Sequence, residues 1–419
     1  MYLKSIHLKD FRCFKELDAD LNPRLNVIVG VNGAGKTAFL QACRIAIASV
    51  LNGLPFRLNE QVALMSYDLR YDYDSKHYKR QDLAVIDFEF DAPYLKNSRS
   101  FNKAKQVKWS FSVSGDIKKW SKSVKKDIST GNKVDLPALL YLGADRFKVE
   151  RKDYGEPAIG ERYRGYFNSM NGKSATYIFE SWFKKMEISE FQNDRQNLGK
   201  DFSQLELLRT ATSSFYPNAE RLYYDTEVEQ LVLLLKNGER KPLHDLSDGE
   251  RFMLLTCITI AFQCILLNPH HDKNALQETG GIVLIDEIDM HLHPAWQREI
   301  LGKLTKTFPK IQFIVTTHSP QVISSIRRNE LFVLSNYQIN HFTKYNEGRD
   351  SNSILIDVFG DSGRPFIYQK KLDDFYTLLE DQKITDAEEL ISQLKEVWGD
   401  NDPAVLRAEF FLNDAKEDL

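Results

Sequence analysis

The chain has 419 residues, 42% of them hydrophobic and 27% charged, an ordinary globular composition long enough for two or three domains of ~150 residues. Its formal net charge of −3 excludes a protein that is basic throughout, so any surface for nucleic acid has to be local. The four cysteines form no CxxC pair, and the sequence contains neither a secretory signal pattern nor a run of ~18 apolar residues. We therefore expect a cytoplasmic protein with reduced thiols, no thiolate zinc site and no membrane span.

The first 29 residues predict three strands. Residues 2–8 and 14–21 alternate in hydrophobicity, and residues 25–29 form a short apolar run that is typical of a buried strand. Because a hairpin precedes the buried strand, we expect an antiparallel layer added to a nucleotide-binding core.

The next segment has the spacing of a phosphate-binding loop, Gly-Val-Asn-Gly-Ala-Gly-Lys-Thr at residues 30–37, ahead of a helix predicted over residues 38–48. Glycines let backbone amides surround phosphates, and the positive helix end faces the same group. We expect Lys36 to act on the γ-phosphate of ATP and the Thr37 hydroxyl to ligate Mg²⁺. The alternative is a glycine-rich turn without a ligand. The predicted nucleotide-binding residues of this loop are Gly30, Asn32, Gly33, Ala34, Gly35, Lys36, Thr37 and Ala38.

Residues 83–90 and 107–113 alternate like strands of an exposed antiparallel sheet. Between residues 99 and 126, nine Lys or Arg residues are opposed by one acid, Asp116, and aromatic residues lie between them. Such a segment could bind a nucleic-acid backbone and stack bases. It could instead be a solvated sheet face whose aromatic residues form a small core, and both interpretations stay open.

From residue 137 to residue 245 the sequence predicts a strand at 137–141, helices at 175–186 and 204–215, and strands at 222–224 and 228–235 with a turn at Asn237-Gly238. No heptad pattern persists, which excludes a long coiled-coil arm. Residues 246–251, Leu-Ser-Asp-Gly-Glu-Arg, open an apolar helix that runs to about residue 267, with Ser247 placed to cap it. Taken alone, this is an ordinary capped helix.

The apolar strand predicted at 282–285 ends in two carboxylates, Asp286 and Glu287. Two acids at this point need a cation, so we expect Asp286 to hold Mg²⁺ and Glu287 to be the base that orients the attacking water. A helix is predicted over residues 295–306 and a further strand over 311–315. His291 and His293 are either metal ligands or, as we prefer, loop residues that structure a subunit contact.

Together these motifs resemble the ATP-binding-cassette type ATPases of the class that includes RecF, the SMC proteins and the OLD nucleases. The resemblance implies an α/β fold: a P-loop ATPase head with an added antiparallel β layer, an α/β insert and a small helical C-terminal region. It divides the chain into residues 1–145 and 243–335, which form the two parts of the ATPase core, an insert at 146–242 and a C-terminal region at 336–419.

The same resemblance implies roles for individual residues. His318 takes the position of the switch histidine that contacts the γ-phosphate, where Ser319 would also cap a helix, and Arg12 resembles an arginine near the phosphates. Lys36, Glu287 and His318 would be the catalytic residues. Ser247, Gly249 and Glu250 of one subunit would close over the phosphate loop of another, so a monomer should be inactive. No clear glutamine loop follows the first helix, and Gln61 or residues 68–70 are possible substitutes.

After residue 318 the sequence shows no strand ending in Glu followed by a strand with paired aspartates, so we expect no built-in nuclease. Apolar stripes at helical spacing in residues 372–379 and 387–397, followed by residues 403–411, predict three short helices. Such stripes form either an intramolecular core or a docking face for a partner.

Three segments ahead of these helices, Asn-Ser-Ile-Leu at 352–355, Val-Phe-Gly at 358–360 and Arg-Pro at 364–365, resemble the PtuA family of ATPase subunits from Septu-type and retron-associated anti-phage systems. This resemblance implies an oligomeric ATPase of low turnover, whose nucleotide state controls a separate HNH nuclease. The alternative is a RecF-like DNA-binding ATPase of recombination or repair, in which residues 99–126 contact duplex DNA. A third hypothesis keeps the nucleotide as a structural ligand only.

Overall fold

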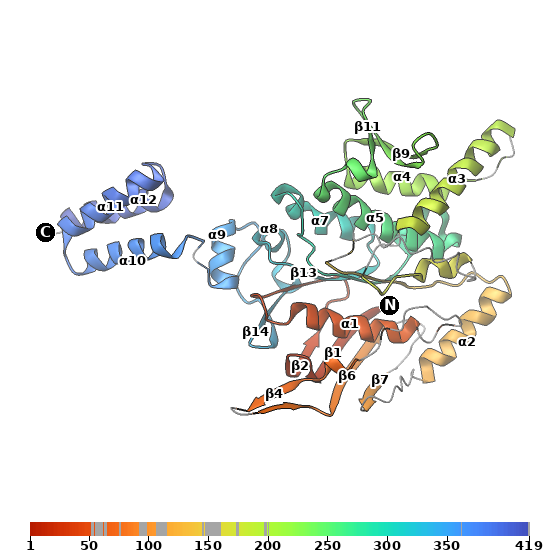
Figure 1. Cartoon of the computed structure of the whole chain (residues 1–419), viewed down its shortest axis with the longest axis horizontal. Coiled ribbons are helices and arrows are strands. Elements are labelled where there is room, and N and C mark those ends of the chain that lie inside the picture. The colour runs from red at the N-terminus through yellow and green to blue at the C-terminus, as the bar shows by residue number, and fades with distance from the viewer. Residues whose placement is uncertain are drawn as a thin grey trace. The chain divides into compact units, whose positions relative to one another are not determined.

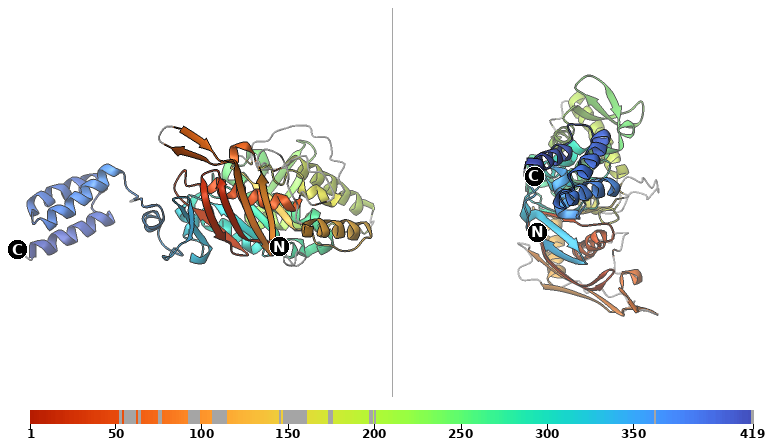
Figure 2. Two further views of the ribbon diagram at one scale, coloured as in Figure 1. Left: turned by 90° about the horizontal axis from the view of Figure 1, so that it is seen from below. Right: turned by 90° about the vertical axis from the view of Figure 1, so that its left-hand side faces the viewer.

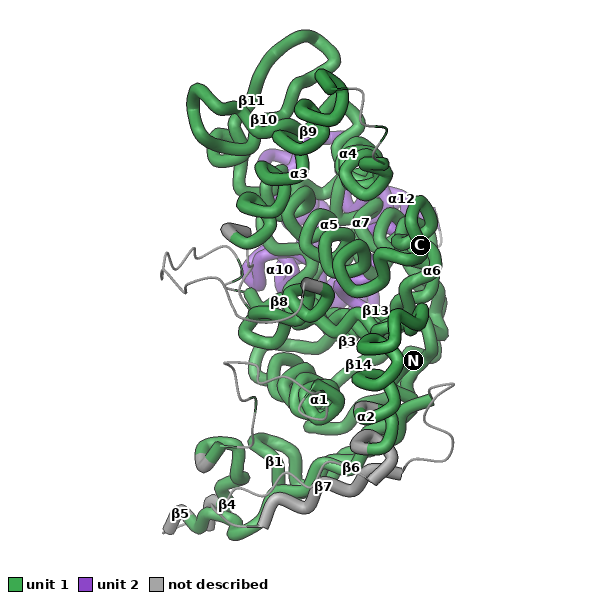
Figure 3. Tube along the Cα trace, turned by 90° about the vertical axis from the view of Figure 1, so that its right-hand side faces the viewer, with its two compact units in different colours: residues 1–349 green, residues 350–419 purple. Residues whose placement is uncertain are grey.

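The computed structural model describes residues 1–51, 54, 62, 65–74, 77–91, 99–105, 115–144, 146, 161–172, 176–196, 199, 201–361 and 363–417. The chain divides into two compact units, residues 1–349 and residues 350–419 (Figure 3). The finer division into four parts that the sequence indicates remains a prediction.

The core of the first unit is a six-stranded sheet in which five strands are parallel and one edge strand is antiparallel. Its strands in spatial order are β15 (Gln338–His341), β14 (Leu331–Ser335), β3 (Leu25–Val29), β13 (Ile311–Thr316), β12 (Gly281–Ile285) and β8 (Ala138–Leu142). Every residue of β3, β8, β12 and β13 is buried, which explains why these strands are almost continuously apolar. Parallel strands bring their carboxyl ends to one edge of the sheet, where ligands bind in open α/β folds.

An antiparallel sheet forms a second layer of this unit. Its strands, in spatial order, are β2 (Phe14–Asp20), β1 (Tyr2–Phe11), β6 (Leu83–Asp91) and β7 (Arg99–Lys105). Helix α1 (Lys36–Leu51) contacts β6 in this layer and β12 and β13 in the central sheet, and it lies between the two layers in Figures 1 and 2. The predicted antiparallel layer is therefore confirmed. The ribbon of β4 (Tyr71–Asp74) and β5 (His77–Arg80) stands apart from both sheets.

Helix α5 (Asp248–Leu267) contacts β8 on the other face of the central sheet. By length and composition it could cross a membrane, but 83% of its apolar window is buried inside the protein, so its hydrophobic surface is covered by the protein's own core. Around it lie α3 (Thr176–Gln196), α4 (Ser203–Phe215) and α7 (Pro294–Thr307), with a small sheet of β9 (Ala219–Asp225), β10 (Gln230–Leu235) and β11 (Arg240–Pro242) (Figure 1).

Helix α2 (Gly115–Ser129) corrects the interpretation of the basic segment as a sheet face. Residues 99–105 are strand β7, but residues 115–126 are helical, and the strand predicted at 107–113 lies outside the described residues. Trp120 and Val124 are buried beneath the helix, whereas Lys119, Lys122, Lys125 and Lys126 are exposed. Trp120 and Val124 are four residues apart, which is a helical spacing, but the lysines around them obscure this period in the sequence.

Short elements complete the chain. In the first unit they are η1 (Ser66–Asp68), η2 (Glu161–Tyr166), η3 (Leu243–Asp245), η4 (Pro269–Asn274), α6 (Ala275–Glu278), α8 (Pro320–Ile323) and η5 (Arg328–Glu330). The second unit begins with α9 (Ser351–Ile354) and the π-helical turn η6 (Leu355–Phe359), and then forms three helices, α10 (Phe366–Glu380), α11 (Ile384–Trp398) and α12 (Pro403–Glu417).

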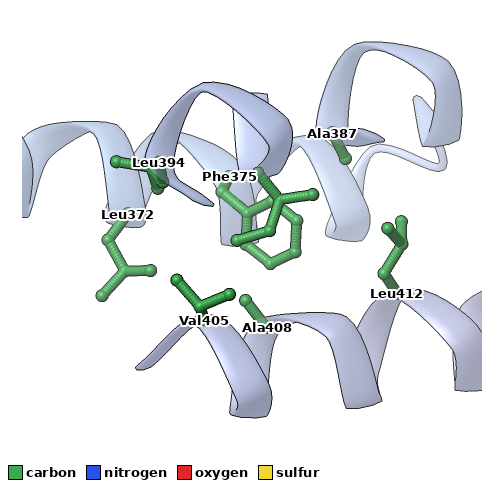
Figure 4. Packing of buried hydrophobic residues seen from close by; sticks show 8 residues of the cluster. Leu372, Phe375, Ala387, Leu394, Val405, Ala408 and Leu412 are labelled. Atoms are coloured by element: carbon green, nitrogen blue, oxygen red, sulfur yellow. The ribbon is translucent and has the colours of Figure 1, made fainter. Parts of the chain in front are cut away.

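The three helices of the second unit enclose a core of their own, shown in Figure 4. Arg364 stacks 3.9 Å from the ring centroid of Trp398 and forms an ion pair with Asp402, which ties the entry of α10 to the start of α12. The apolar stripes are thus an intramolecular core, although Val397 at the end of the second stripe is 57% exposed. The buried core residues are Leu372, Phe375, Ala387, Ile391, Leu394, Val405, Ala408 and Leu412.

Candidate nucleotide-binding site

The loop between β3 and α1 can form only with glycine at specific positions. A Cβ on Gly30 would lie 2.4 Å from the carbonyl oxygen of Leu334, so no side chain fits there. Gly35 has φ +106°, and a Cβ on it would lie 2.8 Å from the Cys13 sulfur. Gly33 has φ +80° but no neighbour within 4 Å of its Cβ position. The loop therefore packs closely on the β1–β2 turn and stays open at its tip, where a ligand can approach the backbone.

The Lys36 side chain lies inside this loop. Its ammonium group donates hydrogen bonds to the carbonyl oxygens of Gly30 at 2.9 Å and Val31 at 3.1 Å. Burial lowers the pKa of Lys36, whereas the carboxylates of Asp286 and its neighbours act in the opposite direction. The predicted loop residues that remain exposed are Asn32, Gly33 and Thr37; Gly35 and Ala38 are half-buried, and Ala34 is buried.

Asp286 follows β12 directly and is 4% exposed. The Thr316 hydroxyl donates a 2.5 Å hydrogen bond to Asp286 Oδ1 and accepts one of 2.8 Å from the Glu287 backbone N–H. Glu287 has φ +50°, a left-handed conformation that costs such a residue about 1–3 kcal/mol unless its surroundings hold it. Both acids therefore lie beyond the end of β12, and the second stands in a left-handed turn.

The structure brings the predicted catalytic residues together at the carboxyl ends of β3, β12 and β13. Burial raises the pKa of Glu287, and the charges of Asp286 and Asp289 raise it further. Burial lowers the pKa of His318, and the positive charge of Lys36 lowers it further. Because β3, β13 and β12 are neighbours in the central sheet, the lysine, the histidine and the three carboxylates that follow their carboxyl ends form one cluster at its edge.

This cluster fits a magnesium ion and a triphosphate. Asp289 was not predicted, and its Oδ1 accepts a 2.5 Å hydrogen bond from the Thr317 hydroxyl. Three neighbouring carboxylates repel one another, which a divalent cation relieves, and carboxylate and hydroxyl oxygens are the ligands that Mg²⁺ prefers. Asp286 of this cluster and the hydroxyl of the exposed Thr37, which follows Lys36 in α1, would hold the ion.

Arg146 is a site residue that the sequence analysis missed. Its Nη1 donates to the carbonyl oxygens of Gly143 at 2.6 Å and Asp286 at 2.8 Å, and its Nη2 donates to that of Glu287 at 3.2 Å. The guanidinium lies 3.9 Å from the centroid of Phe252 on α5, and burial lowers the pKa of Arg146 to about 9. A buried cation thus fixes the backbone of both acids against helix α5. In the sequence, only the position of Arg146 shortly after an apolar strand could have indicated that it belongs to the site.

Arg12 lies in the β1–β2 turn, next to Cys13, and is held there by the segment that follows α1. The Arg12 N–H donates to the Asp68 carbonyl oxygen, and its Nε donates to Asp68 Oδ1, both at 2.7 Å. The Arg70 N–H donates to the Asp10 carbonyl oxygen at 3.0 Å. Residues 68–70, a possible substitute for a glutamine loop, are therefore joined to the β1–β2 turn, whereas Gln61 lies outside the described residues.

Ser247 and Glu250 form a capping box at the start of α5. The Ser247 hydroxyl accepts from the Glu250 N–H, and the Glu250 side chain accepts from the Ser247 N–H at 2.9 Å. The Tyr216 hydroxyl donates to Glu250 Oε1 at 2.6 Å. A Cβ on Gly249 would lie 2.4 Å from the His291 carbonyl oxygen. Within the described residues, no hydrogen bond or ion pair connects Ser247 or Gly249 with the phosphate loop of the same chain.

His293 and His291 take part in the local structure of the loop before α7. His293 Nδ1 accepts a 3.3 Å hydrogen bond from the Ala295 N–H and so caps α7, and His291 occupies a left-handed turn at φ +61°. Neither belongs to a cluster of three metal-ligating side chains in the described part of the chain. Ser319 caps α8, as the sequence predicted.

Comparison with known proteins relates the chain to a family of AAA domains, a retron ATPase, a Septu protein and an OLD nuclease. Residues 25–324 match the family described as "AAA domain, putative AbiEii toxin, Type IV TA system". The retron Ec83 probable ATPase of Escherichia coli is 27% identical over 96% of this chain and 84% of its own length. The Septu protein PtuA of Bacillus mycoides (strain KBAB4) is 27% identical over 80% of this chain and 40% of its own length. An OLD nuclease of Thermus scotoductus is 23% identical over 78% of this chain and 61% of its own length.

Proposed function

We propose that this chain, which belongs to the AAA-domain family described as a putative AbiEii toxin of type IV toxin–antitoxin systems, is an ATPase subunit of a bacterial anti-phage complex. The observation that carries this proposal is that Lys36, His318 and the carboxylates after β12 follow the carboxyl ends of neighbouring strands at one edge of the sheet. A lysine inside a glycine loop facing paired acids is the arrangement that phosphoryl transfer from ATP requires.

Each residue would have a separate task in hydrolysis. The amides of the phosphate loop and Lys36 would bind the β- and γ-phosphates, and His318 would contact the γ-phosphate from the neighbouring strand. Magnesium, when bound, would neutralise phosphate charge, with Thr37 and Asp286 as its protein ligands. Glu287 would accept a proton from the attacking water, for which its raised pKa suits it. Arg146 would keep both acids in position.

The complete site would need two subunits. Ser247 is exposed and caps helix α5. Among the described residues, no hydrogen bond or ion pair connects the start of this helix with the phosphate loop of the same chain. Backbone amides at a positive helix end are well suited to bind a γ-phosphate, so we expect Ser247, Gly249 and Glu250 to cover the loop of a second copy. Nucleotide binding would then control assembly, and a separated subunit would have little turnover.

The effector of the complex would be a separate HNH nuclease, a proposal that the similarity to a Septu protein and a retron ATPase supports. Because an OLD nuclease is also a relative, the division of labour needs a direct test. We expect the chain expressed with its neighbouring genes to copurify with a nuclease subunit. The chain alone should leave plasmid DNA intact with Mg²⁺ and ATP; cleavage by the isolated chain would show that the nuclease is built in.

A RecF-like contact with duplex DNA is a second candidate function, which the exposed lysines of α2 favour. If these lysines bind phosphates, neutralising Lys119, Lys125 and Lys126 should weaken DNA binding for all sequences and reduce the salt slope by roughly one unit for each lysine–phosphate pair removed. Binding is measured by fluorescence anisotropy over a salt series. The control variant loses the same number of positive charges, because Lys303, Lys310 and Lys416 on other parts of the chain are neutralised instead. Equal binding by both triple variants would exclude α2 as the DNA surface.

A further inference from the structure

Three side chains converge outside the nucleotide-binding site. Asp135 Oδ1 lies 2.7 Å from His270 Nε2 and 2.8 Å from His271 Nε2, and one potential ligand atom from each residue lies within 4.8 Å of the others. Asp135 precedes β8 by three residues, so the cluster lies near the amino end of that strand. The nucleotide cluster follows the carboxyl ends of the sheet. The two clusters therefore lie at opposite ends of the parallel strands.

The local backbone holds this cluster in place. Asn268, the fully buried residue that ends α5, accepts from the Leu136 N–H at 2.8 Å and donates to the Leu136 carbonyl oxygen at 2.9 Å. This pairing fixes the loop that carries Asp135 beside the turn that carries the histidines. Asp272 adopts φ 49° and ψ −125°, which ends that turn sharply. Two consecutive histidines thereby face the same carboxylate oxygen, with ring centroids 4.4 Å apart.

Hydrogen bonding alone does not explain why both histidines meet the Asp135 carboxylate. His271 Nε2 is buried, and among the described residues no partner of acceptable hydrogen-bond geometry meets it, although a carboxylate oxygen lies 2.8 Å away. Two imidazoles and a carboxylate, with water as a fourth ligand, are a common zinc donor set. Zinc bonds of about 2.0–2.1 Å place tetrahedral ligand atoms roughly 3.3 Å apart, so the cluster has to open by about half an ångström. The Asp135 side chain is 62% exposed and free to make that adjustment.

We propose that Asp135, His270 and His271 form a zinc-binding site that fastens the end of helix α5 to the start of β8. The histidines follow α5 within four residues of its last residue, and Asp135 leads into β8. Zinc would bridge two segments 135 positions apart in the sequence and stabilise the folded state by mass action. Because α5 carries Ser247 and Gly249 at its other end, the same ion would hold the helix of these residues against the sheet. The proposal does not depend on ATP hydrolysis.

The test uses the full chain, stripped of metal and free of nucleotide. Titration with Zn²⁺ alone, followed by calorimetry, should show a zinc site separate from any ion bound by the carboxylates after β12, and the midpoint of thermal unfolding should rise with zinc concentration. Co²⁺ should give the visible absorption of a four-coordinate site without a thiolate charge-transfer band. Asp135→Asn, which alters an exposed side chain, and His271→Gln should each weaken zinc binding. The loss should exceed the ~10–100-fold that is typical when a residue hydrogen-bonded to a metal ligand is replaced, because each variant removes a ligand itself.

The matched control is the exposed pair of His244 and Asp245, whose His Nε2 and carboxylate oxygen lie 3.1 Å apart without a third donor among the described residues. His244→Gln should bind zinc like the unaltered chain. Zinc affinity that is the same for Asp135→Asn, His271→Gln and the unaltered chain would overturn the proposal, as would failure of the unaltered chain to bind zinc. A thiolate band with Co²⁺ would assign the metal to cysteine and also overturn it.

Discussion

Glu287→Gln should lower steady-state phosphate release by about 10²–10⁴-fold, the usual contribution of a general base, while ATP binding persists. The substitution keeps the size of the side chain and its left-handed turn, and it removes only the group that accepts the proton from water. The Lys36 ammonium and the backbone of the phosphate loop are unchanged, so nucleotide binds but is not turned over. The bound-ATP state should therefore accumulate, and an assembly stabilised by nucleotide should persist in size-exclusion chromatography with light scattering.

The control for this variant is Glu299→Gln on α7, an exposed glutamate paired with Lys303 on the same helix, which should turn over ATP normally. The pH dependence gives a second readout. Because burial and two neighbouring carboxylates raise the pKa of Glu287, the unaltered chain should become less active on acidification at a higher pH than an ordinary glutamate would allow. Residual activity of Glu287→Gln should lack that step. Equal turnover by the variant would exclude Glu287 as the base.

Mixing two inactive variants should restore ATP hydrolysis if the site is shared between subunits. Lys36→Ala removes the cation of the phosphate loop, and Ser247→Arg places a bulky side chain on the exposed start of α5. Each variant alone should have almost no turnover. In a mixed dimer, the loop of one subunit meets the unaltered Ser247 of the other, so one intact site forms. An equal mixture of freely exchanging dimers should recover about a quarter of the original activity.

A second mixture serves as the control for this experiment. Lys36→Ala and Glu287→Gln alter the same half of the site, because the structure places both residues in one cluster of a single chain. Mixing these two variants should therefore restore nothing. If the mixture with Ser247→Arg also remains inactive although subunits exchange, Ser247 does not complete the site of a neighbouring subunit, and the proposed assembly is wrong.

Local patterns in the sequence located the main elements and much of the candidate site, and the resemblance that these motifs carry implied the ATPase fold. Periodicity gave the hairpin, the buried strands and α5, and glycine spacing located the loop that β3 and α1 enclose. Ser247 followed three residues later by Glu250 indicated the capping box. The fold class that the resemblance implied, an α/β P-loop ATPase head with an added antiparallel layer, is confirmed. The strands, the glycine loop and the helix cap depend on residues a few positions apart, so a single sequence is enough to predict them.

Tertiary structure alone decided the contacts between distant residues. Arg146 reaches the carbonyl oxygens of Asp286 and Glu287 only because β8 and β12 are neighbours in the sheet, and residue spacing carries no record of strand order. The pairing of Arg12 with Asp68 and the meeting of Asp135 with the two histidines have the same origin. The left-handed turn at Glu287 is held by the Thr316 hydroxyl from the adjacent strand. Sequence patterns thus located the chemical groups, whereas packing of the sheet set which of them act on one another.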